Sequence, residues 1–168
     1  MAETQIRKYA VIERLGKMDV DVITLTPDTA TEECAAGDVI FQADELPNMV
    51  SVNAGTCMVH SIGVLDDDDK GQPIDIVFMD TTGLLDAGDD GGEIDAADGV
   101  IPDAILGVVQ ITSYFDGIAW QYGYKTNIGL VLKAPSASKS IYVSAVNRGS
   151  TATWTAAGLR LKIGVIKD

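Results

Sequence analysis

The chain has 168 residues, and its 25 acidic and 12 basic side chains give a formal net charge of −13 at pH 7. This length suits one domain, and a hydrophobic share of 46% supplies enough apolar side chains for a core, which excludes wholesale disorder. The negative charge argues against binding nucleic acid or an anionic membrane surface, because both attract clustered Lys and Arg.

The first seventeen residues are locally basic, with four cationic side chains against only Glu3 and Glu13. This charge inversion indicates an arm that contacts an acidic partner. Its candidate contact residues are Ile6, Arg7, Lys8, Tyr9, Arg14 and Lys17. No apolar h-region begins the chain, so we expect synthesis in a cytoplasm, and no apolar run is long enough to span a membrane.

The remaining apolar runs are short, rich in Val and Ile, and separated by Gly, Asp, Asn and Pro, as is typical of strands joined by turns. In residues 159–165, apolar side chains alternate with Arg160 and Lys162, which predicts a strand with one face in a core. Strands are predicted, in chain order, at 20–25, 38–43, 49–53, 56–65, 74–80, 106–112, 118–124, 128–133, 140–146 and 159–166.

No long window keeps a helical period. Residues 9–15 fit either a helix or a strand, and 31–36 and 102–106 each favour a single helical turn. About ten strands at this spacing predict an all-β fold, an antiparallel, jelly-roll-like β-sandwich. We expect residues 1–18 to form an arm or first element and 19–168 a single β-sandwich domain.

Two acidic loops, residues 66–73 and 81–99, are candidate cation sites. Neither matches the ligand spacing of a calcium loop, so solvated acidic turns are the favoured interpretation and bound Ca²⁺ is the alternative. The candidate ligands are Asp66, Asp68, Asp86, Asp89, Asp90 and Glu93.

Catalytic motifs are absent from the sequence. His60 is the only histidine, and Cys34 and Cys57 lie 23 residues apart, without the spacing of a zinc motif. We therefore expect neither enzymatic activity nor a cofactor. The two cysteines are expected to be reduced and packed, with a single disulfide as the alternative.

One aromatic cluster, residues 120–124, holds Trp120, Tyr122 and Tyr124. It is the one candidate for a carbohydrate platform. Because it alternates like an ordinary strand face, a place in the core or at an interface is favoured.

Five segments, residues 61–80, 105–109, 127–133, 141–154 and 158–166, resemble virion structural proteins of tailed bacteriophages, notably marine ones. The resemblance implies a capsid decoration (cement) protein that binds the outer surface of the major capsid shell. The implied partners are the major capsid protein and the chain itself, as a homodimer or homotrimer, on a virion assembled in the host. The basic arm is then our candidate for the capsid contact. A tail-associated or receptor-binding, lectin-like module that uses Trp120 and Tyr122 is the alternative.

Overall fold

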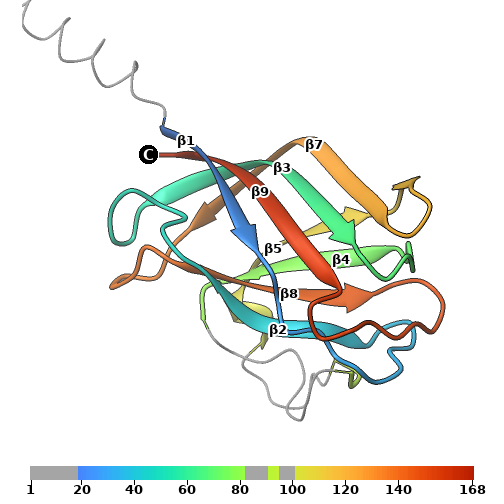
Figure 1. Ribbon diagram of the computed structural model, residues 1–168. Coiled ribbons are helices and arrows are strands. Elements are labelled where there is room, and N and C mark those ends of the chain that lie inside the picture. Colours follow the sequence, from blue (N-terminus) through green and yellow to red (C-terminus); the bar gives the residue numbers. More distant parts are fainter. Residues whose placement is uncertain (1–18, 82–90, 95–100) are drawn as a thin grey trace, which may run out of the picture.

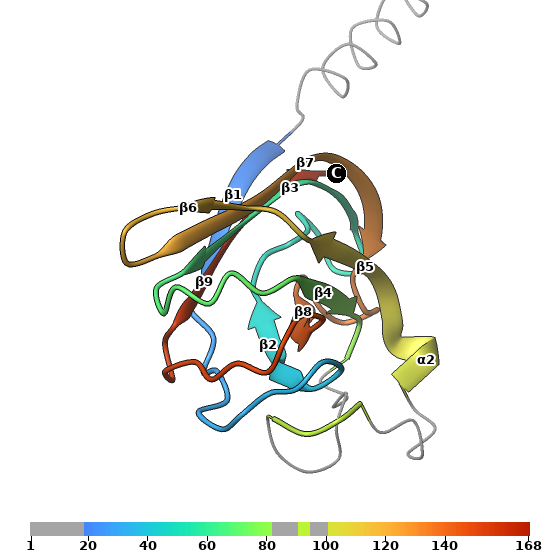
Figure 2. The same cartoon turned by 90° about the vertical axis from the view of Figure 1, so that its right-hand side faces the viewer.

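The computed structural model describes residues 19–81, 91–94 and 101–168. Nine strands in this part of the chain form two antiparallel sheets, which lie as two layers (Figures 1 and 2). The strands are β1 (Asp19–Leu25), β2 (Val39–Leu46), β3 (Thr56–Asp66), β4 (Ile74–Met79), β5 (Ile105–Ile111), β6 (Tyr114–Asp116), β7 (Gln121–Lys133), β8 (Ile141–Asn147) and β9 (Leu159–Lys167). A short helix, α2 (Ile101–Ala104), precedes β5.

The strand order defines the topology. One sheet has five strands in the order β1-β9-β3-β7-β6, and the other has four in the order β2-β8-β4-β5. Without the short strand β6, each sheet has four strands and the chain passes repeatedly between the two layers, which is the jelly-roll arrangement. The predicted all-β, jelly-roll-like sandwich is therefore confirmed, with nine strands in the described residues.

The core lies between the two sheets, because each strand directs alternate side chains inward. Along β9, Leu161 and Ile163 are buried while the side chains of Arg160 and Lys162 are exposed, as the sequence pattern predicts. Phe78 of β4 belongs to the same buried cluster on the opposite sheet. Burying a side chain of this size contributes about 1.5–3 kcal/mol.

The strand predicted at 49–53 is wrong. This segment bends between β2 and β3, although Met49 and Val50 are buried in the core. Asn48 and Ala54 flank it with positive φ angles of 56° and 58°, which interrupt an extended chain. The apolar side chains of Met49 and Val50 therefore reach the core from a bend and not from a strand.

Other predictions need smaller corrections. The strands predicted at 118–124 and 128–133 are one strand, β7, except that residues 118–120 precede it in a bend. Asn127 and Gly129 of β7 have positive φ angles of 57° and 69° at an irregularity in the pairing with β3. The turn predicted at 102–106 is shifted to α2, and residues 31–36 contain no helix. Residues 9–15 lie outside the described residues.

Within the described ranges, no helix has the length and apolar composition needed to cross a membrane. The C-terminal end of β9 lies beside the start of β1, since Asp19 pairs with Lys167 (Figure 1).

Candidate functional site

The outer face of the five-stranded sheet carries a line of apolar side chains that is exposed at both ends and half-buried in the middle. The antiparallel register places one residue from each of four neighbouring strands opposite the next, and these are Val20, Ile166, Met58 and Val131. We call these four residues the apolar row. Val20 and Val131, at its two ends, are 68% and 65% exposed. Contiguous exposed apolar surface of this kind is typical of a binding surface.

Beyond the apolar row, small residues hollow the same face. Gly164 lies opposite Ser61, and a Cβ atom at Gly164 would collide with the Ser61 hydroxyl oxygen. A Cβ atom at Gly63 would likewise collide with the phenolic oxygen of Tyr122, whose ring leans across β3. Both glycines thus allow side chains from neighbouring positions to lie over the backbone.

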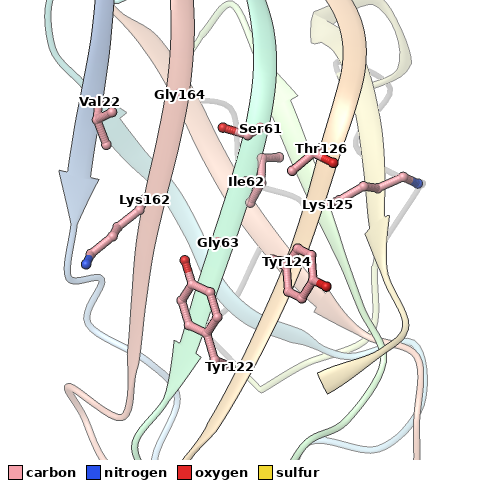
Figure 3. A pocket seen from close by; sticks show the side chains of 10 residues that line it. All are labelled: Val22, Ser61, Ile62, Gly63, Tyr122, Tyr124, Lys125, Thr126, Lys162 and Gly164. Carbon is pink, nitrogen blue, oxygen red and sulfur yellow. The ribbon is translucent and has the colours of Figure 1, made fainter. Parts of the chain in front are cut away.

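The result is a depression of about 310 Å³ (Figure 3). Tyr122 and Tyr124 line it with ring centroids 6.4 Å apart and ring planes 19° from parallel. Lys162 leaves β9 at the opposite rim and extends toward β1 in Figure 3. We call this depression the tyrosine hollow, and its principal residues are Ser61, Gly63, Tyr122, Tyr124, Lys162 and Gly164.

The charge of the two sheets differs. Every Lys and Arg within the nine strands belongs to the five-stranded sheet: Lys125, Lys133, Arg160, Lys162 and Lys167. Arg160 pairs with Asp67, and Lys167 pairs with Asp21 at 2.8 Å. Lys162 forms no ion pair within the described ranges, so its charge is available to a ligand.

The first acidic loop is organised by Asp66, at the end of β3. This side chain is 2% exposed and accepts hydrogen bonds from the backbone N–H groups of Asp68, Lys70 and Gly71 at 3.2, 2.9 and 2.7 Å. Burial raises the pKa of Asp66, while the three N–H donors act in the opposite direction. Asp66 therefore stabilises the loop as a hydrogen-bond acceptor.

Two further carboxylates of this loop accept hydrogen bonds from other parts of the chain. Asp67 forms a two-pronged ion pair with Arg160, with a closest distance of 2.8 Å. Asp68 accepts hydrogen bonds from the backbone and the hydroxyl of Thr155. No set of three or more His, Cys, Asp or Glu side chains in the described ranges is arranged to hold a metal ion. A cation at Asp66 and Asp68 stays a prediction.

Of the other predicted capsid-contact and cation-loop residues, only Glu93 lies in the described part of the chain. Glu93 is exposed, and its backbone forms an isolated bridge with Asp38. The remaining candidates lie outside the described residues: Ile6, Arg7, Lys8, Tyr9, Arg14, Lys17, Asp86, Asp89 and Asp90.

Trp120 and Tyr124 of the aromatic cluster are exposed, so a place in the core is excluded for them, and a place at an interface stays a prediction. Trp120 is 40% exposed and packs against Phe115, with ring centroids 5.9 Å apart. Tyr124 is 62% exposed on the sheet face. Sequence reasoning thus detected the tyrosines of the hollow but missed Gly63 and Gly164, because only the register between strands brings them together.

The buried cysteines Cys34 and Cys57 are not joined by a disulfide. Burial, with a smaller contribution from the Asp168 carboxylate, raises the pKa of the Cys57 thiol to about 11. At neutral pH this thiol is therefore protonated and a poor nucleophile.

No protein-family model matches the chain, and no curated protein matches its sequence. Several solved structures are similar to it. The capsid of Ralstonia phage GP4 is 19% identical, with 91% of this chain and 86% of that chain covered and a TM-score of 0.43. Tomato aspermy virus is 9% identical, with 97% and 93% covered and a TM-score of 0.42. Because these TM-scores are low, the jelly-roll assignment rests on the strand order of the chain itself.

Proposed function

We propose that the chain is a structural protein of a virus particle, a decoration protein that binds the outer surface of the major capsid shell and stabilises it. The resemblance of its strand and turn segments to virion proteins of tailed bacteriophages supports this proposal. The strand order is compatible with it, because jelly rolls occur in viral capsid domains and in lectin domains. A fold by itself assigns no function, so the contact surface has to support the proposal.

The observation that carries the proposal is the apolar row. It crosses four paired strands without interruption, and both end residues, Val20 and Val131, are mostly exposed. A paired sheet holds such a surface rigid, which lowers the ordering cost of binding. Repetition of the contact over a symmetric shell adds avidity, so that each single contact can be modest.

The basic arm precedes the row in the sequence. Only Met18 and Asp19 separate Lys17, the last basic residue of the arm, from Val20 of the row. The sequence therefore joins the arm to the row at the start of β1. We propose that both contact the major capsid protein, with the arm binding an acidic patch and the row an apolar one.

The same proposal gives the assembly and its location. Closed homodimers or homotrimers would match the local symmetry axes of a shell, and the chain would be located on the virion surface after synthesis in the host cytoplasm. Its function would require neither a cofactor nor a chemical step.

The test is a reattachment assay with particles assembled without the chain. Purified chain is expected to restore a saturable, stoichiometric layer. The double variant Val20→Asp, Val131→Asp should lose it while keeping its unfolding temperature, because both side chains are already exposed. Val108→Asp is the matched control, since Val108 is 49% exposed on the four-stranded sheet. Wild-type occupancy by the double variant would eliminate the row as the contact.

A second candidate is a tail-associated or receptor-binding module, and the tyrosine hollow favours it. Copy number separates the two candidates. A head decoration protein occurs on the order of hundreds of copies per particle, whereas a tail module occurs in tens or fewer.

A further inference from the structure

We propose that the tyrosine hollow binds a sugar residue that carries a carboxylate, as in a uronic or sialic acid unit of a surface glycan. The hollow lies on the same face of the five-stranded sheet as the apolar row, so the inference concerns the free chain, and glycan binding and attachment through the row would compete.

The first argument is that recognition here must use side chains. The hollow lies over β3 and β9, and each of these strands is paired on both of its edges. Their backbone groups are committed to the sheet, so an extended peptide could not add to it as a further strand. A ligand of the hollow therefore meets aromatic rings, hydroxyl groups and the lysine side chains Lys125 and Lys162.

These groups match the two faces of a sugar ring. The rings of Tyr122 and Tyr124 provide an apolar surface for the C–H face of a pyranose, as aromatic side chains do in amphipathic contacts. Within the described ranges neither phenolic oxygen has a hydrogen-bond partner, so both can bond to the sugar hydroxyls. Ser61 and Thr126 add further hydroxyl groups at the lining. A mainly apolar hollow with a few polar groups is the usual form of a small-ligand site.

The charge argues for an acidic sugar. Lys162 has no ion-pair partner in the described ranges, although the chain carries a net charge of −13. Its four-carbon stem is flexible and lets the ammonium swing from the rim over the hollow. A single carboxylate on the ligand would pair with it, and a charge-assisted hydrogen bond of this kind is stronger than a neutral one. The other lysine of the lining, Lys125, donates a hydrogen bond of 3.4 Å to the backbone carbonyl oxygen of Gln110. Two lysines at the hollow are too little positive charge for a polyphosphate chain.

The two glycines let Tyr122 and Ser61 lie low over the sheet. A Cβ atom at Gly63 or Gly164 would collide with the phenolic oxygen of Tyr122 or the hydroxyl oxygen of Ser61, so a side chain at either position would displace these groups from their places in the lining. The depression of about 310 Å³ is at the lower end of the size of ligand sites, which suits one sugar unit of a longer chain.

Isothermal titration calorimetry on the full chain tests the proposal with matched pairs of ligands. Sialyllactose is compared with lactose, and tetragalacturonate with maltotetraose. We expect at least one carboxylated member to bind, more tightly than its neutral counterpart and more weakly as salt concentration rises. Tyr124→Ala and Lys162→Gln should each weaken that binding about tenfold, through loss of the stacked ring and of the charge-assisted bond.

Lys133→Gln is the matched control, because it removes the same charge from another exposed position on the five-stranded sheet. It should leave binding unchanged, and all three variants should unfold at the wild-type temperature. No binding of either carboxylated ligand at millimolar concentration would overturn the proposal. Equal affinity for charged and neutral members, or full affinity in Tyr124→Ala, would overturn it as well. None of these results would alter the copy number on which the decoration role depends.

Discussion

Asp68 joins the β3–β4 loop to the segment before β9, because its Oδ2 atom accepts a hydrogen bond of 2.7 Å from the backbone N–H of Thr155. Asp67 makes a parallel connection to Arg160 of β9. Two adjacent carboxylates of an acidic run thus stabilise the approach to the strand that lies between β1 and β3. The run has a structural role in the described part of the chain.

Asp66 should be the most important side chain of this loop for stability. Replacing it by Ala leaves three backbone N–H groups without their acceptor in a buried position, and we expect the free energy of unfolding to fall by about 3 kcal/mol. Urea unfolding measures this change. Asp116→Ala removes an equal charge from an exposed position of β6 and should have little effect. An equal fall in the free energy of unfolding in the two variants would contradict the role of Asp66 as the acceptor that stabilises the loop.

Asp44 should make stability depend on pH. Burial, together with the neighbouring Asp28 carboxylate, raises the pKa of Asp44 above its ordinary value. The folded chain therefore holds this proton more tightly than the unfolded chain, and the contribution to stability is lost as pH rises through the raised pKa. Asp44→Asn should increase the unfolding temperature at neutral pH, and this gain should vanish below the ordinary aspartate pKa of about 3.9.

The control for Asp44 is Asp116→Asn, which makes the same change of net charge at an exposed site. A gain of the same size in this control would attribute the effect to overall charge. A gain in Asp44→Asn that persists at low pH would show that burial of the charge is not its cause.

Cys57 should be inert in the folded chain. Its thiol is buried and has a pKa of about 11, so the reactive thiolate is scarce at neutral pH. Iodoacetamide should leave it unmodified in native conditions and alkylate it in denaturant, as mass spectrometry of the digested chain would detect. Rapid native alkylation would contradict the packing around β3.

The basic arm should matter for attachment and not for folding. Deleting residues 2–17 should abolish binding to the shell while leaving the unfolding transition of the β-sandwich in place. Circular dichroism follows the fold, and the reattachment assay follows the binding. A truncated chain that decorates particles at wild-type occupancy would exclude the arm as a capsid contact.

Sequence periodicity predicted the parts of the fold that depend on a single strand. The alternation around Arg160 and Lys162 identified β9 and its inward face correctly. It failed at Met49 and Val50, because an apolar pair can reach the core from a bend as well as from a strand. It also missed β6, whose three residues are too few to show a period.

The candidate site was less accessible to sequence reasoning. The apolar row and the tyrosine hollow each combine residues from strands far apart in the chain, such as Val20 with Ile166 and Gly63 with Tyr124. Strand pairing over such distances is fixed by tertiary packing. A local pattern could show that Tyr122 and Tyr124 share a face, but not that Gly63 of another strand would let the Tyr122 ring lie over it.

The most direct test of the central claim, that this chain is a structural component repeated over a virus shell, is its copy number in purified particles. Quantitative mass spectrometry against the major capsid protein gives that ratio. The account predicts a fixed ratio, with copies on the order of hundreds per particle. Absence of the chain from the particles, or a ratio of a few copies per particle, would contradict it.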